Sequence, residues 1–178
     1  MKTVSANGAE IPAIGLGTWE LRGEQCAELV MAALQGGYTH IDTAQMYQNE
    51  AEVGEGIRAS GQNRDNVFLT TKIWPENYAG SDFDRAVDER LNLLDCSTVD
   101  LLLLHWPPRA VSMAEAVAGL NRAKRAGLTR HIGISNFTVR QVEEAVALSD
   151  EPLVCNQIEY HPLINQDKVR AACTRHGL

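Results

Sequence analysis

The stretch from Val99 to Asn136, VDLLLLHWPPRAVSMAEAVAGLNRAKRAGLTRHIGISN, has the pattern of a strand, a helix and a second strand. Val99–Leu104 is an almost continuous apolar run of strand length, and a second run rich in β-forming residues follows at His131–Ile134. Between them, Ser112-x-x-Glu115 matches a capping box, which satisfies a free backbone N–H in the first turn of a helix. The helix that follows has an apolar stripe and a candidate C-terminal cap, Met113, Val117, Leu120 and Gly127. Two strands joined by a helix are the building block of a parallel α/β fold.

The same alternation of β-forming and amphipathic segments runs along the whole chain of 178 residues. An Asn7-Gly8 pair, which tolerates the positive φ angles of a tight turn, predicts a small hairpin at the start. Strands are expected after it at Ala13–Leu16, Tyr38–Ile41, Val67–Thr71, Val99–Leu104, His131–Ile134 and Val154–Gln157. Two more capping boxes, Ser81-x-x-Asp84 and Thr138-x-x-Gln141, predict helix starts. The first of these two helices has the apolar stripe Phe83, Val87, Leu91 and Leu94.

Strands that alternate with helices favour a (β/α)8 barrel, the TIM-barrel class of α/β fold, which takes roughly 250 residues. This chain supplies about six of the eight units. A last helix is expected from about Asn165 to His176-Gly177, so Leu178 falls where a seventh strand should begin. We therefore expect residues 1–178 to form one incomplete TIM-barrel domain, a hairpin followed by units one to six.

The composition argues against several classes of partner. The formal net charge is -7 and no Lys- or Arg-rich block occurs, so the chain lacks the charge pattern of a protein that binds nucleic acid or an anionic membrane. No apolar run is long enough to span a bilayer and the first residues do not resemble a signal peptide, which favours a cytoplasmic protein. Because the cysteines show no zinc-ligand spacing, we expect no metal site and reduced, mostly buried thiols. They are Cys26, Cys96, Cys155 and Cys173.

Polar residues follow the ends of the predicted strands. The carboxyl ends of barrel strands meet at one rim, where the active sites of barrel enzymes lie. Residues expected there include Gly17, Thr18, Trp19, Asp42, Lys72, His105, Trp106, Ser135, Asn136 and Gln157. An ammonium at the barrel mouth needs a nearby carboxylate to offset its desolvation, and Asp42 is placed to supply one for Lys72. A structural ion pair is the alternative for Lys72 and Asp42. His105 taken alone is equally consistent with a hydrogen-bonded structural histidine.

Five longer motifs carry a resemblance to a known family. In chain order they are Ile41-Asp42-Thr43-Ala44-x-x-Tyr47-x-Asn49-Glu50, Thr71-Lys72-Ile73-Trp74, Leu104-His105-Trp106-Pro107, Gly133-Ile134-Ser135-Asn136-Phe137 and Asn156-Gln157-Ile158-Glu159-Tyr160-His161-Pro162. They resemble the signatures of aldo-keto reductases, most closely those of the bacterial diketogluconate and methylglyoxal reductase type. The resemblance runs from about Ile11 to Leu178.

The resemblance implies an oxidoreductase that reduces aldehydes and ketones by hydride transfer, with a catalytic tetrad of Asp42, Tyr47, Lys72 and His105. A carbonyl that receives hydride develops negative charge on its oxygen, which needs a proton donor. Tyr47 is the implied donor; the Lys72 ammonium would ease release of its proton, and Asp42 would hold the ammonium in place. His105 would donate a hydrogen bond to the substrate oxygen and so orient the carbonyl.

The resemblance also implies NADPH as the cofactor and a small carbonyl compound as the substrate. The implied cofactor-binding residues are Gly17, Thr18, Asp42, Ser135, Asn136 and Gln157. Hydroxyl and amide side chains suit the polar, uncharged carboxamide of nicotinamide. The implied walls of the substrate pocket are Trp19, Trp74 and Trp106, for which plain packing is the alternative. The full-length form is expected to be a monomer.

Two other functions stay open. Lysines at the strand ends of barrels form Schiff bases in lyases and aldolases, so Lys72 is also a candidate nucleophile. Some relatives of this fold are regulatory subunits that bind the nicotinamide cofactor with little turnover, and the fold alone does not distinguish such a subunit from an enzyme.

Overall fold

The computed structural model describes residues 2–178. In this part of the chain the main sheet is parallel throughout, and its six strands lie in sequence order. They are β3 (Leu16–Gly17), β4 (His40–Asp42), β5 (Phe68–Ile73), β6 (Val99–Leu104), β7 (Thr129–Ser135) and β8 (Leu153–Gln157). Neighbouring strands are also neighbours along the chain, because each connection passes through a helix and returns beside the strand it left.

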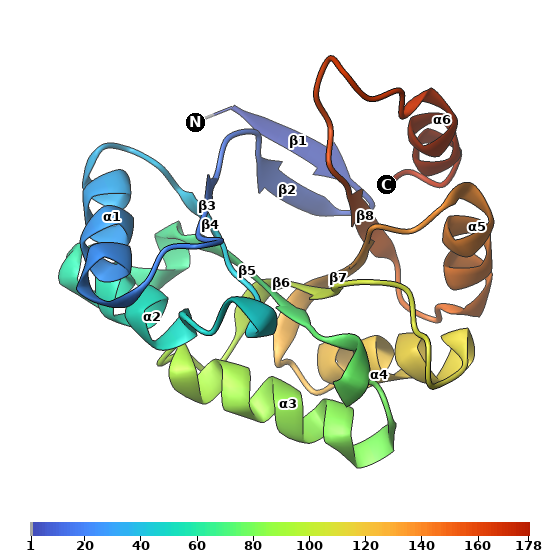
Figure 1. Cartoon of the computed structure of the whole chain (residues 1–178), viewed down its shortest axis with the longest axis horizontal. Coiled ribbons are helices and arrows are strands. Elements are labelled where there is room, and N and C mark those ends of the chain that lie inside the picture. Colours follow the sequence, from blue (N-terminus) through green and yellow to red (C-terminus); the bar gives the residue numbers. More distant parts are fainter. Residues whose placement is uncertain (1) are drawn as a thin grey trace.

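Helices cover the outer face of this sheet, whose strands form an arc in the centre of Figure 1. Within residues 2–178 the α-helices are α1 (Gly23–Gln35), α2 (Glu50–Ala59), α3 (Gly80–Leu93), α4 (Met113–Arg125), α5 (Val139–Leu148) and α6 (Asp167–Arg175). Short 3-10 helices are η1 (Gln45–Tyr47), η2 (Arg64–Asn66) and η3 (Pro75–Asn77). Since a helix follows each strand of a curled parallel sheet, the arrangement is that of six βα units of a (β/α)8 barrel, and the predicted fold class is confirmed.

The first strand of the sheet is shorter than its prediction and begins later. The sequence predicts Ala13–Leu16, whereas β3 comprises Leu16–Gly17. The backbone N–H of Ala13 donates to the carbonyl of Lys2 at 2.9 Å, so this residue extends the N-terminal hairpin instead of joining the parallel sheet. The second strand ends one residue later than predicted, at Asp42.

Side chains of β6 alternate between the two faces of the sheet, which divides its four consecutive leucines between two packing layers. Leu102 and Leu104 belong to the large core between the sheet and the helices. Leu101 and Leu103 point to the concave side, where they belong to a smaller apolar cluster with Ala9. Successive residues of β6 therefore face the helices and the concave side in turn.

An antiparallel hairpin packs against the concave side of the sheet (Figure 1). The hairpin consists of β1 (Thr3–Ala6) and β2 (Ala9–Pro12). Its turn residues Asn7 and Gly8 have φ angles of 43° and 88°, so the predicted tight turn is confirmed. The side-chain amide of Asn7 donates to the carbonyls of Leu153 and His176 at 2.7 and 2.9 Å. These bonds join the hairpin to β8 and to the end of α6.

One of the three predicted capping boxes is complete, at Thr138 and Gln141, and at Ser112 only the hydroxyl half of the box is formed. The Ser112 hydroxyl accepts from the N–H of Glu115 at 3.1 Å, and the N–H of Thr138 donates to the side chain three residues later at 3.0 Å. The third prediction is wrong, because α3 begins at Gly80 and Ser81 lies inside its first turn. The N–H of Gly80 donates instead to Glu115 Oε1 at 3.2 Å, so a residue of α4 satisfies this helix start.

The predicted apolar stripes are buried, whereas the cysteines are less buried than expected. The stripes comprise Phe83, Val87, Leu91, Leu94, Met113, Val117 and Leu120, all in the core. The cysteines are free thiols, but only Cys26 is fully buried, so the prediction of mostly buried thiols is wrong. Cys155 and Cys173 lie on β8 and α6, and β8 is an edge strand of the sheet.

Candidate active site

An open cleft of about 740 Å³ lies on the concave side of the sheet and reaches the carboxyl ends of its strands. It is lined by Pro12, Ala13, Gly15, Gly17, Trp19, His40, Asp42, Tyr47, His105, Ser135, Asn136, Gln157, Ile158 and Glu159. Of the residues predicted from the sequence, the cleft brings together Gly17, Trp19, Asp42, Tyr47, His105, Ser135, Asn136 and Gln157. Convergence of several strand ends on one cleft is the arrangement expected of a barrel active site.

Lys72 lies directly beneath this cleft and is almost fully buried, with 1% of its surface exposed. It stands in register with Leu103 and so faces the concave side of the sheet. Its ammonium contacts Asp42 Oδ1, donates to the Thr43 carbonyl at 2.9 Å and lies 3.4 Å from the Tyr47 hydroxyl. The three N–H groups of the ammonium are matched by three oxygen acceptors.

Both oxygens of the Asp42 carboxylate are engaged. Oδ1 contacts Lys72, and Oδ2 accepts a 2.7 Å hydrogen bond from the side-chain amide of Gln157 on β8. The strand carbonyl of Asp42 accepts from the hydroxyl of Thr18 at 3.2 Å. Thr18 itself is fully buried, so it supports Asp42 from below and does not line the cleft.

His105, at the end of β6, is held between two aromatic rings and is 6% exposed. Its ring meets that of Tyr47 edge to face at a centroid distance of 5.6 Å and that of Trp74 at 5.2 Å. Among residues 2–178, none pairs with its buried Nδ1. Burial and then the charge of Lys72 lower the pKa of His105 to about 4, against the opposing effect of Asp42. The ring is therefore neutral at pH 7.

The ends of β7 and β8 are joined by hydrogen bonds beside the cleft. Asn136 adopts a left-handed conformation, with φ of 64°. Its side-chain amide donates to the His105 carbonyl at 2.9 Å and to the Ser135 hydroxyl at 3.0 Å. The Ser135 hydroxyl donates in turn to the Gln157 carbonyl at 2.9 Å. This network keeps polar side chains fixed along one wall of the cleft.

A buried polar layer, to which the sequence analysis gave no role, lies behind the strand that carries Lys72. Glu50, 2% exposed, pairs with Arg90 of α3 at 2.6 Å and accepts from the Thr71 hydroxyl at 2.5 Å. Burial raises the pKa of Glu50 to about 7, despite the opposing Arg90 guanidinium. Because Thr71 precedes Lys72, these contacts anchor the strand segment that carries the lysine. Glu50 is the last residue of the first longer motif, three residues after Tyr47. That position is the sequence signal from which its place near the site could have been predicted.

The three tryptophans differ in their relation to the cleft. Trp19 lines the cleft and is 61% exposed. Trp74 reaches the site through its contact with His105. Trp106 is 40% exposed, and its backbone is fixed by Tyr78, whose buried hydroxyl donates to the Trp106 carbonyl at 2.9 Å. Neither Trp74 nor Trp106 belongs to the described lining of the cleft.

The family follows from a direct comparison. Residues 13–178 match the model of the aldo/keto reductase family, which is most of the chain. The chain belongs to the aldo/keto reductase family. The family predicted from the five motifs is therefore confirmed.

Individual relatives agree with this assignment. Methylglyoxal reductase DkgB of Escherichia coli O157:H7 is 44% identical over 171 residues, which are 94% of this chain and 64% of that protein. A crystal structure described as a 2,5-diketo-D-gluconic acid reductase B is 52% identical, with a TM-score of 0.98 over 100% of this chain and 63% of that one. An aldo-keto reductase of Bombyx mori in complex with NADP is 34% identical, with a TM-score of 0.93 over 99% of this chain and 64% of that one. The chain thus spans less than two thirds of the length of these relatives.

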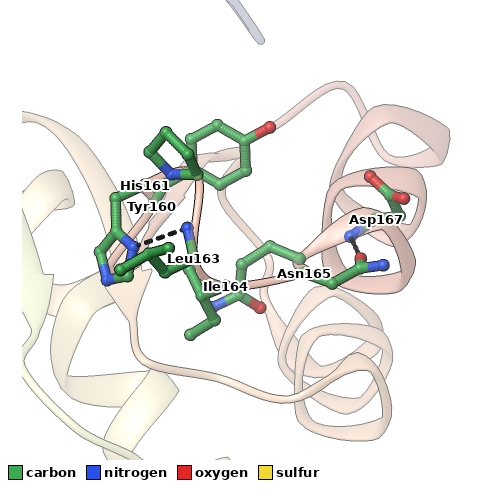
Figure 2. Close-up of a pocket in the computed structure, with 8 residues that line it drawn as sticks. Tyr160, His161, Leu163, Ile164, Asn165 and Asp167 are labelled. Atoms are coloured by element: carbon green, nitrogen blue, oxygen red, sulfur yellow. Dashed lines mark hydrogen bonds between the residues drawn. The ribbon is translucent and has the colours of Figure 1, made fainter.

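A second hollow in this aldo/keto reductase, of about 600 Å³, is formed by a single loop between β8 and α6 (Figure 2). It is lined by residues 160–167, and none of them lines the cleft described above. His161 accepts from the N–H of Leu163 at 3.2 Å, and Asn165 accepts from the N–H of Asp167 at the start of α6 (Figure 2). These bonds are local to the loop, so we assign the chemistry to the cleft and not to this hollow.

The described residues contain neither a candidate metal cluster nor a candidate membrane-spanning helix. Between residues 2 and 178, no three His, Cys, Asp or Glu side chains are grouped as they would be around a metal ion. None of the helices in the same range combines the length and the apolar character needed to cross a membrane.

Proposed function

We propose that this aldo/keto reductase reduces aldehydes and ketones to alcohols, with hydride from NADPH and a proton from Tyr47. The observation that carries the proposal is the position of the Lys72 ammonium, buried under an open cleft between the Asp42 carboxylate and the Tyr47 hydroxyl. Ionisable groups that are buried beside specific charge partners in a cleft are characteristic of catalytic sites.

Tyr47 donates its hydroxyl proton to the carbonyl oxygen as that oxygen gains negative charge. The phenolate left behind is stabilised by Coulomb attraction to Lys72, 3.4 Å away. Asp42 offsets the desolvation cost of the ammonium, and Gln157 fixes the carboxylate from its other side. The tetrad therefore keeps a positive charge beside the proton donor without exposing it to water.

His105 orients the substrate carbonyl. With its pKa near 4, the imidazole is neutral at pH 7, so it donates a hydrogen bond from one ring nitrogen without adding a second positive charge beside Lys72. The edge-to-face contacts with Tyr47 and Trp74 limit rotation of the ring. A carbonyl oxygen bound between His105 and Tyr47 is held in the position that proton transfer requires.

The β7 and β8 side of the cleft fits a nicotinamide cofactor, which supplies hydride when bound. Asn136 and Gln157 use their amide nitrogens in hydrogen bonds within the protein, which leaves amide oxygens to accept from a carboxamide N–H. Apart from its chain neighbours, no described residue has an atom within 4 Å of the position that a Cβ on Gly17 would take. A flat group can therefore approach the backbone there. NADPH is proposed over NADH because the Bombyx mori relative is in complex with NADP.

The proposed substrate is a small carbonyl compound. Trp19 offers an exposed apolar surface at the cleft, and Trp74 backs the His105 ring. Methylglyoxal is the first substrate to test, because a relative 44% identical to this chain is named a methylglyoxal reductase.

We also propose that residues 1–178 are an incomplete (β/α)8 domain whose full-length form acts as a monomer in the cytoplasm. The relatives, of which this chain spans 63 to 64%, support the first part. The four free thiols suit a reducing compartment.

Schiff-base chemistry at Lys72 is not favoured. A Schiff base requires a neutral amine that the substrate can reach. Lys72 is 1% exposed, and its ammonium is surrounded by Asp42, the Thr43 carbonyl and Tyr47.

The proposal is tested by Tyr47→Phe, assayed for methylglyoxal-dependent oxidation of NADPH and for NADPH binding by fluorescence. Turnover should fall by roughly 100-fold or more, the usual contribution of a positioned acid, while the dissociation constant for NADPH stays unchanged. Tyr38→Phe is the matched control, since Tyr38 is 37% exposed and lies outside the cleft. Undiminished turnover in Tyr47→Phe would disprove the role of Tyr47; a wild-type protein that never oxidises NADPH with any small aldehyde or ketone would disprove the activity.

A further inference from the structure

The side chain of Gln45 makes two hydrogen bonds that link the Tyr47 segment to the loop after β5. Gln45 is the first residue of η1, and Tyr47 is the last. Its Oε1 accepts from the backbone N–H of Trp74 at 2.8 Å, and its Nε2 donates to Asn77 Oδ1 at 2.9 Å. One amide therefore contacts both ends of the turn from residue 74 to residue 77.

This turn depends on Gln45 because it begins where the sheet stops. β5 ends at Ile73, so the N–H of Trp74 lies beyond the parallel ladder and takes its acceptor from Gln45. The turn closes on itself through the N–H of Asn77, which donates to the Trp74 carbonyl at 2.9 Å. A backbone N–H that loses its acceptor is unfavourable unless it finds another partner, so loss of the Gln45 acceptor favours a different position for Trp74.

The position of Trp74 matters because three rings and this amide form a closed series of contacts. Trp74 packs edge to face on His105, with centroids 5.2 Å apart, and His105 packs on Tyr47 at 5.6 Å. Tyr47 is joined back to Gln45 through the single turn of η1, in which the N–H of Gln48 donates to the Gln45 carbonyl at 3.2 Å. A shift of Trp74 is therefore transmitted to the two groups that hold the carbonyl.

We propose that Gln45 is a positioning residue for the reduction, which sets the angle between His105 and Tyr47 by fixing Trp74. This inference rests on the function proposed above, because that function assigns His105 and Tyr47 their roles. Gln45 touches neither the substrate nor the reacting atoms. Its effect on rate comes from geometry, and a displacement of about 1 Å in a catalytic group can cost roughly 100-fold.

The test compares Gln45→Asn, Gln45→Glu and the control Gln62→Asn. Asparagine keeps an amide but is one methylene shorter, so it cannot reach the N–H of Trp74 from the same backbone position. Glutamate restores the reach: one carboxylate oxygen accepts from Trp74, and Asn77 turns its own amide nitrogen toward the other. Gln62 is exposed and outside the cleft, and its side chain makes no hydrogen bond within the described residues, which makes Gln62→Asn a matched change.

With methylglyoxal and NADPH, kcat of Gln45→Asn should fall at least tenfold, while the dissociation constant for NADPH and the melting temperature stay near those of the wild type. Gln45→Glu should retain kcat within about threefold, and Gln62→Asn should match the wild type. Equal kcat in Gln45→Asn and the wild type would overturn the proposal. So would equal losses in Gln45→Asn and Gln45→Glu that follow a common fall in melting temperature, because these indicate a merely structural role.

A second readout does not need turnover and so separates this inference from the proposed function. Proton NMR of the His105 ring reports the ring current of Trp74, whose centroid is 5.2 Å away. Gln45→Asn should shift the His105 ring protons, and Gln45→Glu should return them toward their wild-type positions. Unshifted His105 signals in Gln45→Asn would overturn the proposal whatever the activity of the protein. If the wild type has no reductase activity but the His105 signals shift in Gln45→Asn, the proposed function is disproved and the role of Gln45 in fixing Trp74 is kept.

Discussion

Replacement of Lys72 with methionine should lower the free energy of unfolding by about 3 kcal/mol, and simultaneous replacement of Asp42 with asparagine should restore most of that loss. Removal of one partner from a buried ion pair leaves the other charge uncompensated, which costs about 3–5 kcal/mol. The lower end applies here, because the Asp42 side chain is 15% exposed and keeps its hydrogen bond from Gln157. In the double variant no charge is left without a partner.

The measurement is urea unfolding of the wild type, Lys72→Met and Asp42→Asn/Lys72→Met, followed by circular dichroism. With a slope of about 2 kcal/mol per molar urea, the single variant should unfold roughly 1.5 M earlier than the wild type. The double variant should return to within about 0.5 M of the wild type. Reductase activity should behave differently and stay absent from both variants, since neither has a positive charge beside Tyr47.

Two outcomes would refute this reasoning. A double variant as unstable as Lys72→Met would mean that the cost comes from lost packing of the lysine stem and not from an uncompensated carboxylate. A double variant that recovers turnover together with stability would mean that Tyr47 transfers its proton without help from the ammonium.

Two further predictions concern stability. The pKa of His105 falls from 6.5 to about 4 on folding. The contribution of neutral His105 to stability is therefore fully present above pH 6.5 and is lost as the pH falls toward 4. Over that window the difference in unfolding free energy between the wild type and His105→Gln should change by about 3 kcal/mol. Glu50 is present in the wild type and in His105→Gln, so the effect of its titration cancels in the difference between their unfolding free energies. A difference that stays constant with pH would contradict a buried, neutral His105. Gly56→Ala should destabilise by about 1–3 kcal/mol, because its Cβ would lie 2.5 Å from the Ala27 carbonyl oxygen and 2.7 Å from Val30 Cβ where α2 meets α1. The exposed neighbour Glu55→Ala is the control, and equal melting temperatures for the two variants would show that α1 and α2 can move apart without cost.

The parts of the site that could be predicted from the sequence are those set by position along a strand. Lys72 and His105 stand at or just past the ends of strongly apolar runs, and barrel geometry brings such ends to one rim. Tyr47 is different, because it reaches the cleft on η1, one short turn beyond β4, and no periodicity marks such a turn. Its assignment came from the resemblance to a family and from no physical pattern in the residues.

What could not be predicted depends on contacts between distant segments. Gln45 bonds to a backbone N–H 29 residues later in the chain, on a loop whose path the sequence does not contain. The Ser81 prediction failed for the same reason, since a side chain from the next helix took over the start of α3 and a local hydroxyl was not needed. The tight turn at Asn7-Gly8 could be predicted, because it depends only on the backbone conformations that these two residues adopt.

The Asn7 side chain also has a consequence for how the molecule opens. It bonds to the carbonyls of Leu153 and His176, which lie 146 and 169 residues away in sequence. The hairpin can form early from local contacts, but its turn is held against the sheet only after β8 and α6 have docked. Fraying of α6 therefore releases the hairpin turn, and displacement of the hairpin deprives α6 of a partner at its end. Two segments that would otherwise unfold independently become one cooperative unit, so proteolytic attack at either end of the described chain requires the opening of both.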